Sequence, residues 1–142
     1  MKRLSILIAD RTPEYCAHLA RWLREHDTTC VHSAAEGMSA AVLLHFDVIV
    51  KATLHEGTSA LEEMRALKRR QPWARVLAVV SAATVEDAPR EFARARRAGA
   101  DAVVSRAVGE RQFRLALRAC WHDAVPHLEA SHPSPNFTLS RA

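Results

Sequence analysis

An α/β domain with a parallel sheet is the fold class that this sequence predicts. Five short apolar segments have the composition of strands buried on both faces of a sheet. Segments with helical periodicity separate them, and this alternation favours a parallel sheet covered by helices on both faces. Five strand–helix units of this size are typical of the flavodoxin-like, doubly wound (βα)5 fold, with strand order 2-1-3-4-5. The predicted strands are residues 4–9, 28–32, 47–51, 75–80 and 101–104.

Each predicted helix has a start signal or an apolar stripe. Pro13 suits the first turn of a helix, so the first helix is predicted to begin there. Ser33 and Ser59 each precede a glutamate by three residues, which predicts capping boxes for the second and third helices. Pro89 would damage a helix interior, so the fourth helix is predicted to begin near Ala88. The last helix has apolar residues at helical spacing: Phe113, Ala116, Leu117, Cys120 and Ala124.

The composition excludes several classes of protein. The 142 residues are 49% hydrophobic and 25% charged, the balance of one soluble globular domain. No apolar run approaches the ~20 residues that a membrane-spanning helix needs. Asp10 and Arg11 end the first apolar stretch before it reaches the length of a signal-peptide core. The three cysteines are too widely spaced for a disulfide framework or a zinc site, so we expect a reduced, cytoplasmic protein.

The composition changes near the end of the chain. We interpret residues 1–124 as the globular domain and residues 125–142 as a tail or linker stub, because prolines and serines accumulate there. Phe137 and Leu139 leave a second interpretation open, in which a short extended segment docks on its own domain or on a neighbour.

One strand and its loop resemble a known family. Residues 46–51 read as a buried strand that leads into a turn and a helix over residues 52–61. This segment resembles the third strand and following loop of bacterial response-regulator receiver domains, which are CheY-like. With the alignment anchored on Asp47, Gly57 and Leu61, the phospho-accepting aspartate of the family falls on Ala52. A methyl group has no nucleophile, so the resemblance implies a receiver that cannot be phosphorylated at this position.

The other receiver elements are also altered, and the resemblance spans residues 4 to about 122. The family has two acidic residues after the first strand that help to hold Mg²⁺, and here they are Asp10 and Arg11. The hydroxyl residue after the fourth strand is kept as Ser81. The lysine after the fifth strand is replaced by Arg106, and the aromatic residue within that strand by Val103.

These substitutions predict an unusual pocket. We expect Arg11, Lys51 and Arg106 to converge on a single carboxylate, Asp10, and to neutralise it through charge-assisted hydrogen bonds. Adding Mg²⁺ to several cations is electrostatically unfavourable, so we expect no divalent cation and no cofactor. The favoured interpretation is a closed salt-bridge cluster. Capture of a small anion with help from Ser81 is the alternative.

A basic surface is predicted on the fourth and fifth helices. In receivers the fourth helix, fifth strand and fifth helix form the usual partner-binding and dimerising face. The corresponding residues here are Arg90, Arg94, Arg97, Val103, Arg111, Arg114 and Arg118. They predict a docking face for an acidic protein partner or for a homodimer, and an ordinary solvated surface is an equally good interpretation.

The resemblance therefore predicts a pseudo-receiver that is not an enzyme. We expect a protein–protein interaction module in bacterial two-component signalling or transcriptional regulation. A nucleic-acid-associated role is an alternative because the net charge is +4, although no nucleic-acid-binding motif is visible. A second alternative is the receiver half of a longer DNA-binding regulator, suggested faintly by residues 139–141.

Overall fold

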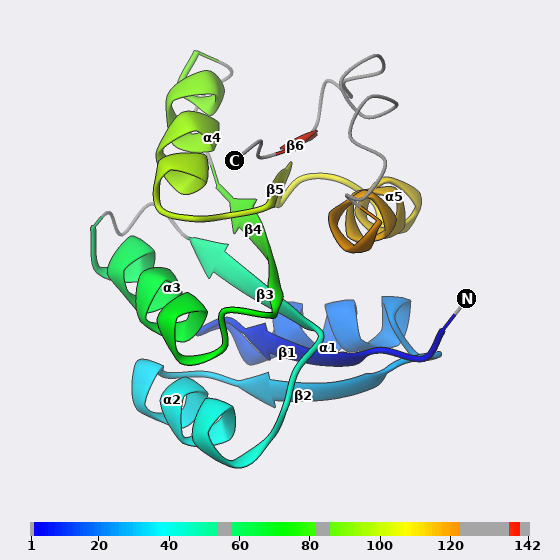
Figure 1. Cartoon of the computed structure of the whole chain (residues 1–142). Coiled ribbons are helices and arrows are strands. Elements are labelled where there is room, and N and C mark those ends of the chain that lie inside the picture. Colours follow the sequence, from blue (N-terminus) through cyan, green and yellow to red (C-terminus); the bar gives the residue numbers. More distant parts are fainter. Residues whose placement is uncertain (1, 54–57, 82–85, 123–136, 140–142) are drawn as a thin grey trace.

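A six-stranded sheet forms the centre of the protein (Figure 1). The computed structural model describes residues 2–53, 58–81, 86–122 and 137–139. The strand order is β2-β1-β3-β4-β5-β6, and the first five strands pair in parallel, which confirms the predicted order 2-1-3-4-5. The parallel strands are β1 (Ser5–Ala9), β2 (Asp27–Val31), β3 (Val48–Thr53), β4 (Arg75–Val80) and β5 (Ala102–Ser105).

Two layers of helices cover the sheet. One face packs against α1 and α5, and the other packs against α2, α3 and α4 (Figure 1). Each face has its own buried cluster, centred on Ile8 and Phe113 on the first and on Ile49 and Met64 on the second. The helices are α1 (Pro13–Trp22), α2 (Ala34–Leu43), α3 (Thr58–Arg70), α4 (Ala88–Arg97) and α5 (Glu110–Trp121).

Most of the predicted helix starts are correct. α1 begins at Pro13 and α4 at Ala88, with Pro89 in its first turn. The hydroxyl of Ser33 accepts a hydrogen bond from the Glu36 N–H at 3.1 Å, which is the predicted cap of α2. The cap predicted at Ser59 is wrong, because α3 already begins at Thr58. The Ser59 hydroxyl instead donates to Glu63 Oε2 at 3.3 Å.

The end of the chain contributes a strand. β6 (Phe137–Leu139) pairs antiparallel with β5, and its middle residue Thr138 lies opposite Val103. The segment that we interpreted as a tail or linker stub therefore includes a short strand docked on its own domain. A sheet edge that would otherwise carry unpaired backbone groups is partly covered by it. Residues 123–136 and 140–142 lie outside the described part of the chain.

Two further observations concern membranes and thiols. None of the helices in the described ranges is long and apolar enough to cross a bilayer. Cys16, Cys30 and Cys120 are all free thiols, as their spacing predicts.

Candidate functional site

Four predicted pocket residues lie at one edge of the sheet. β1, β3, β4 and β5 are parallel, so their carboxyl ends meet there. Asp10 follows β1, Ser81 follows β4 and Arg106 follows β5. Ala52 lies within β3, in register with Val79 of β4, and not at the start of a turn as predicted. It is buried in the apolar cluster on the α1–α5 face.

Asp10 and Arg106 form an ion pair at this edge. Nη2 of Arg106 is 3.4 Å from Oδ2 of Asp10, whose side chain is only 1% exposed. Backbone hydrogen bonds hold both residues in place: the Asp10 N–H donates to the Val31 carbonyl, and the Arg106 N–H donates to the Val80 carbonyl. A buried carboxylate without a partner is strongly destabilising, so loss of the guanidinium would destabilise the fold.

Tyr15 of α1 completes the cluster, and the sequence analysis missed it. Cζ of Arg106 lies 3.7 Å from the centroid of the Tyr15 ring, within the range of a cation–π contact. Three enclosed polar atoms have no hydrogen-bond partner in the described structure: Asp10 Oδ1, Tyr15 Oη and Arg106 Nη1. Burial raises the pKa of Tyr15 to about 12, with the Arg106 cation lowering it and Asp10 raising it. The phenol is therefore neutral near pH 7.

Lys51 does not converge on Asp10, which corrects our prediction. Its Nζ is 2.9 Å from Oε1 of Glu63 on α3, and Nη2 of Arg11 is 3.7 Å from Oε2 of the same carboxylate. Adjacent residues of a strand point to opposite faces of the sheet, so Lys51 points away from the face that Ala52 occupies. Burial raises the pKa of Glu63, but the ion pair with Lys51 outweighs it and the net shift is downward.

The charges are thus divided between two clusters. Asp10 pairs with Arg106 on the α1–α5 face, and Glu63 pairs with Lys51 and Arg11 on the α2–α3 face. Neither Tyr15 nor Glu63 belongs to the family pattern on which the sequence analysis relied. One signal that could have found Glu63 is strand alternation, because Lys51 needs a partner from the helix that follows β3.

The carboxylates of this site that the structure describes are already paired with cations. Mg²⁺ requires near-octahedral oxygen ligands, supplied in part by carboxylates. Among the described residues, the Asp10 carboxylate is paired with Arg106, and the neighbouring Glu63 carboxylate is paired with Lys51 and Arg11. No group of three or more histidine, cysteine, aspartate or glutamate side chains in those residues has a metal-binding arrangement.

The basic residues predicted to form one docking face are divided between two faces. α4 and α5 cover opposite faces of the sheet, and β6 lies along β5 between them (Figure 1). Arg94 and Arg97 line a groove of about 180 Å³ beside α3, together with Glu62 and Arg65. Val103 is fully buried and paired with β6, so it lies on no exposed surface. The side chain of Arg90 is exposed.

The arginines of α5 line a different groove. It has a volume of about 500 Å³ and lies between α5 and the end of α1. Its lining residues include Leu23, His26, Arg111, Arg114, Leu115 and Arg118. The predicted α4–β5–α5 face is therefore not one continuous basic surface.

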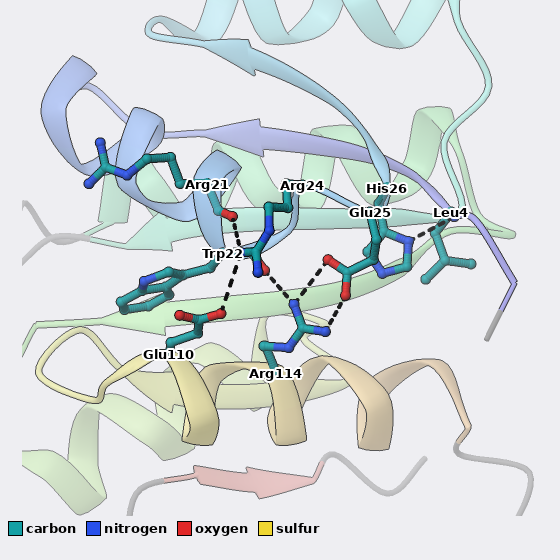
Figure 2. Close-up of polar contacts among 8 residues, drawn as sticks. All are labelled: Leu4, Arg21, Trp22, Arg24, Glu25, His26, Glu110 and Arg114. Carbon is teal, nitrogen blue, oxygen red and sulfur yellow. Dashed lines mark hydrogen bonds and ion pairs between the residues drawn. The ribbon is translucent and has the colours of Figure 1, made fainter.

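Arg114 is held in this groove by a network of polar contacts (Figure 2). Its Nη1 lies 3.0 Å from Glu25 Oε1, its Nη2 bonds the other oxygen, and Nη1 also donates to the Trp22 carbonyl. The ion pair lowers the pKa of Glu25 to about 2. Next to Glu25, the buried ring of His26 accepts a hydrogen bond from the Leu4 N–H through Nδ1 at 3.0 Å. Arg114 is therefore a structural residue as much as a surface charge.

Comparison with known proteins is informative at the level of structure. Neither a protein-family model nor a curated protein sequence matches the chain. A response regulator from Burkholderia pseudomallei, solved with a phosphorylated aspartic acid, is similar in structure with a TM-score of 0.70 and 23% identity, over 93% of this chain and 76% of that one. A CheY-like receiver domain protein from Methanospirillum hungatei has a TM-score of 0.73 and 16% identity, over 89% of this chain and 99% of that one.

The chain has the fold of a receiver domain. A third similar structure, described as a pilus assembly-related protein from Burkholderia pseudomallei, has a TM-score of 0.69 and 24% identity, over 84% of this chain and 90% of that one. At these identities the receiver likeness concerns the fold, and function depends on the residues at its sites. In this chain Asp10, Ala52 and Arg106 lie at the carboxyl edge of the parallel strands.

Proposed function

We propose that this protein is a pseudo-receiver: a receiver-fold module that works in signalling or transcriptional regulation through protein–protein contacts and without phosphorylation. The observation that carries the proposal is Ala52, an apolar residue buried within β3 where the receiver pattern places the phospho-accepting aspartate. A methyl side chain cannot attack a phosphoryl donor, so the reaction lacks its nucleophile.

The ion pairs around Ala52 support the same proposal. Nη2 of Arg106 forms an ion pair with Oδ2 of Asp10 at 3.4 Å. On the other face of the sheet, Nζ of Lys51 forms an ion pair with Oε1 of Glu63 at 2.9 Å. Both cations therefore have carboxylate partners without any added group. A domain held in one arrangement by such pairs presents a constant surface, and a partner that distinguishes two states of a receiver would read only one of them.

Ion pairs within the predicted basic surface argue against a nucleic-acid role. Arg94 pairs with Glu91 at 3.3 Å and Arg114 with Glu25, so two of the arginines of the predicted basic surface already have anionic partners. Nucleic-acid binding draws on lysine and arginine side chains that are available to phosphates.

Phosphorylation with a small-molecule donor tests the proposal. The purified chain is incubated with acetyl phosphate and Mg²⁺ beside a receiver that retains its aspartate, and both are analysed by intact mass. We expect a phosphoryl adduct on the control receiver and none on this chain. The double variant Arg11→Asp/Ala52→Asp supplies the missing carboxylates and serves as the gain-of-function comparison. A phosphoryl adduct on an aspartate of the wild-type chain, identified by its cleavage with hydroxylamine and by peptide mapping, would overturn the proposal.

A further inference from the structure

Exposed apolar side chains gather at the end of the sheet opposite to Asp10. Five large hydrophobic side chains in the described structure are exposed, and four of them lie near the amino ends of β3 and β4. Leu43, at the end of α2, is 80% exposed, and Trp73, just before β4, is 53% exposed. We define the apolar end patch by five residues: Val42, Leu43, Leu44, His45 and Trp73. Soluble proteins rarely leave such residues together in water unless they form a contact surface.

The two segments that make up the patch are in direct contact. The rings of His45 and Trp73 stack, with their centroids 4.9 Å apart and their planes within 1° of parallel. His45 lies in the connection from α2 to β3, and Trp73 lies in the turn between α3 and β4. An exposed tryptophan held flat against a neighbouring ring has little side-chain freedom left to lose when a partner binds.

The buried side chain of Gln71 joins the same two segments through hydrogen bonds. Its Nε2 donates to the carbonyls of Ala41 at 2.8 Å and Leu44 at 2.6 Å, and its Oε1 accepts from the Phe46 N–H at 2.9 Å. The Gln71 side chain is buried, so these bonds are shielded from water. The patch is therefore a preorganised surface and not a pair of independent loops.

Two exposed arginines lie next to the patch in the sequence. Arg69 and Arg70 are exposed residues of the last turn of α3, four and three positions before Trp73. Within the described part of the chain, neither forms an ion pair, whereas the neighbouring Lys68 is bound to Asp101 at 3.1 Å. Tryptophan and arginine are the residue types most enriched among the energetically dominant positions of protein interfaces.

We propose that the apolar end patch docks a segment of a partner protein in which apolar side chains are flanked by carboxylates. The apolar residues would cover Leu43 and Trp73, and the carboxylates would pair with Arg69 and Arg70. This inference rests on the proposed interaction role and names its surface and the chemistry of the partner. A second copy of this chain is a poor occupant, because its own apolar end patch contains no carboxylate that could pair with Arg69 and Arg70.

Photo-cross-linking tests the proposal in the cells that encode the protein. Leu43 is replaced by p-benzoylphenylalanine in the full chain, and the same replacement at Leu115 is the matched control, since Leu115 is the exposed leucine of α5 outside the patch. We expect a protein adduct at position 43 that mass spectrometry maps to a segment rich in aspartate or glutamate around apolar residues. Trp73→Ala and Arg70→Glu should each reduce the adduct by roughly tenfold or more, as hot-spot residues do, and Leu115→Asp should leave it unchanged.

Each other outcome overturns the docking proposal. Adducts with phospholipid would assign the patch to a membrane surface, and adducts with a second copy would assign it to a homodimer. A mapped segment without carboxylates, or no adduct at position 43, would also reject it. Protein adducts at position 115 alone would show that the partner binds at α5 and not at the apolar end patch. The proposed interaction role would then still hold. Failure of the proposed function is seen separately, as phosphorylation of the wild-type chain.

Discussion

The guanidinium of Arg106 lies over the ring of Tyr15, with Cζ 3.7 Å from the ring centroid. The contact joins the end of β5 to the first turn of α1, and the ion pair with Asp10 adds the end of β1. The side chain of Arg106 therefore connects β5, α1 and β1 at this edge of the sheet. The first two predictions concern Arg106 and the residues that it contacts.

Tyr15 should titrate well above an ordinary tyrosine. Burial raises its pKa from 10.0 to about 12, and the chain has no other tyrosine, so the ultraviolet absorbance of tyrosinate reports on Tyr15 alone. The unfolded chain then loses this proton at lower pH than the folded chain. The free energy of unfolding should therefore fall as pH rises between about 10 and about 12. A folded-state midpoint equal to that in urea would contradict the buried position of the phenol.

Replacing Arg106 should destabilise the fold. Arg106→Ala leaves the buried Asp10 carboxylate without its cation, and breaking a buried pair in this way costs about 3 kcal/mol. The double variant Asp10→Asn/Arg106→Ala should recover part of that loss, because it removes the uncompensated charge. Urea denaturation measures both effects. Arg97→Ala, at an exposed arginine of α4, is the control and should change stability by less than ~0.5 kcal/mol; an equal loss in both single variants would refute the assignment.

The pair on the other face of the sheet should behave in the same way. Glu63→Gln leaves Lys51, whose side chain is 7% exposed, with an unpaired charge, and we expect a loss of about 3 kcal/mol in the free energy of unfolding. Lys51→Met/Glu63→Gln removes the buried charge altogether, and its stability should return close to that of the wild type. If the double variant is as unstable as Glu63→Gln, the loss of stability comes from altered packing and not from the unpaired charge of Lys51.

His26 should make the stability of the fold depend on pH. Burial is the main cause that lowers the pKa of His26, with Glu25 opposing it, and Nδ1 must be unprotonated to accept from the Leu4 N–H. The unfolded chain therefore binds the proton at higher pH than the folded chain. The free energy of unfolding should fall as the pH drops below 6.5, the ordinary value.

Thermal denaturation of His26→Asn measures this effect, because the amide oxygen can still accept from Leu4 and does not titrate. We expect a smaller loss of melting temperature between pH 7 and pH 5 than in the wild type. His122→Asn, at an exposed histidine, is the matched control. Identical pH profiles for the wild type and His26→Asn would show that another group is responsible.

The elements of the fold were predictable because their signals are local. Apolar runs, helical periodicity, Pro13 and the Ser33–Glu36 box each act within a few residues, and the structure confirms them. The error at Ser59 has the same origin, since an identical four-residue pattern occurs one residue inside α3. Local patterns set where helices and strands form, with an uncertainty of about one turn at their ends.

The site was less predictable because its contacts join residues far apart in the chain. Ala52 was predicted at the start of a turn, but pairing with β4 extends β3 through Thr53 and includes it. The partners of the charged residues also depend on tertiary packing. Lys51 pairs with Glu63 because strand alternation turns it to the α3 side, and Arg106 pairs with Asp10 because parallel strands end at one edge.

What the sequence by itself determined is the order of the strands and helices, because apolar runs and helix-start signals depend on residue types a few positions apart. Only the tertiary structure decided how the charges are shared. α4 and α5 lie on opposite faces of the sheet, so Arg94 and Arg114 line different grooves. β6 pairs with β5 beside Val103, and the rings of His45 and Trp73 stack. The physical reason is that ion pairs and stacked rings form between whichever side chains packing brings together.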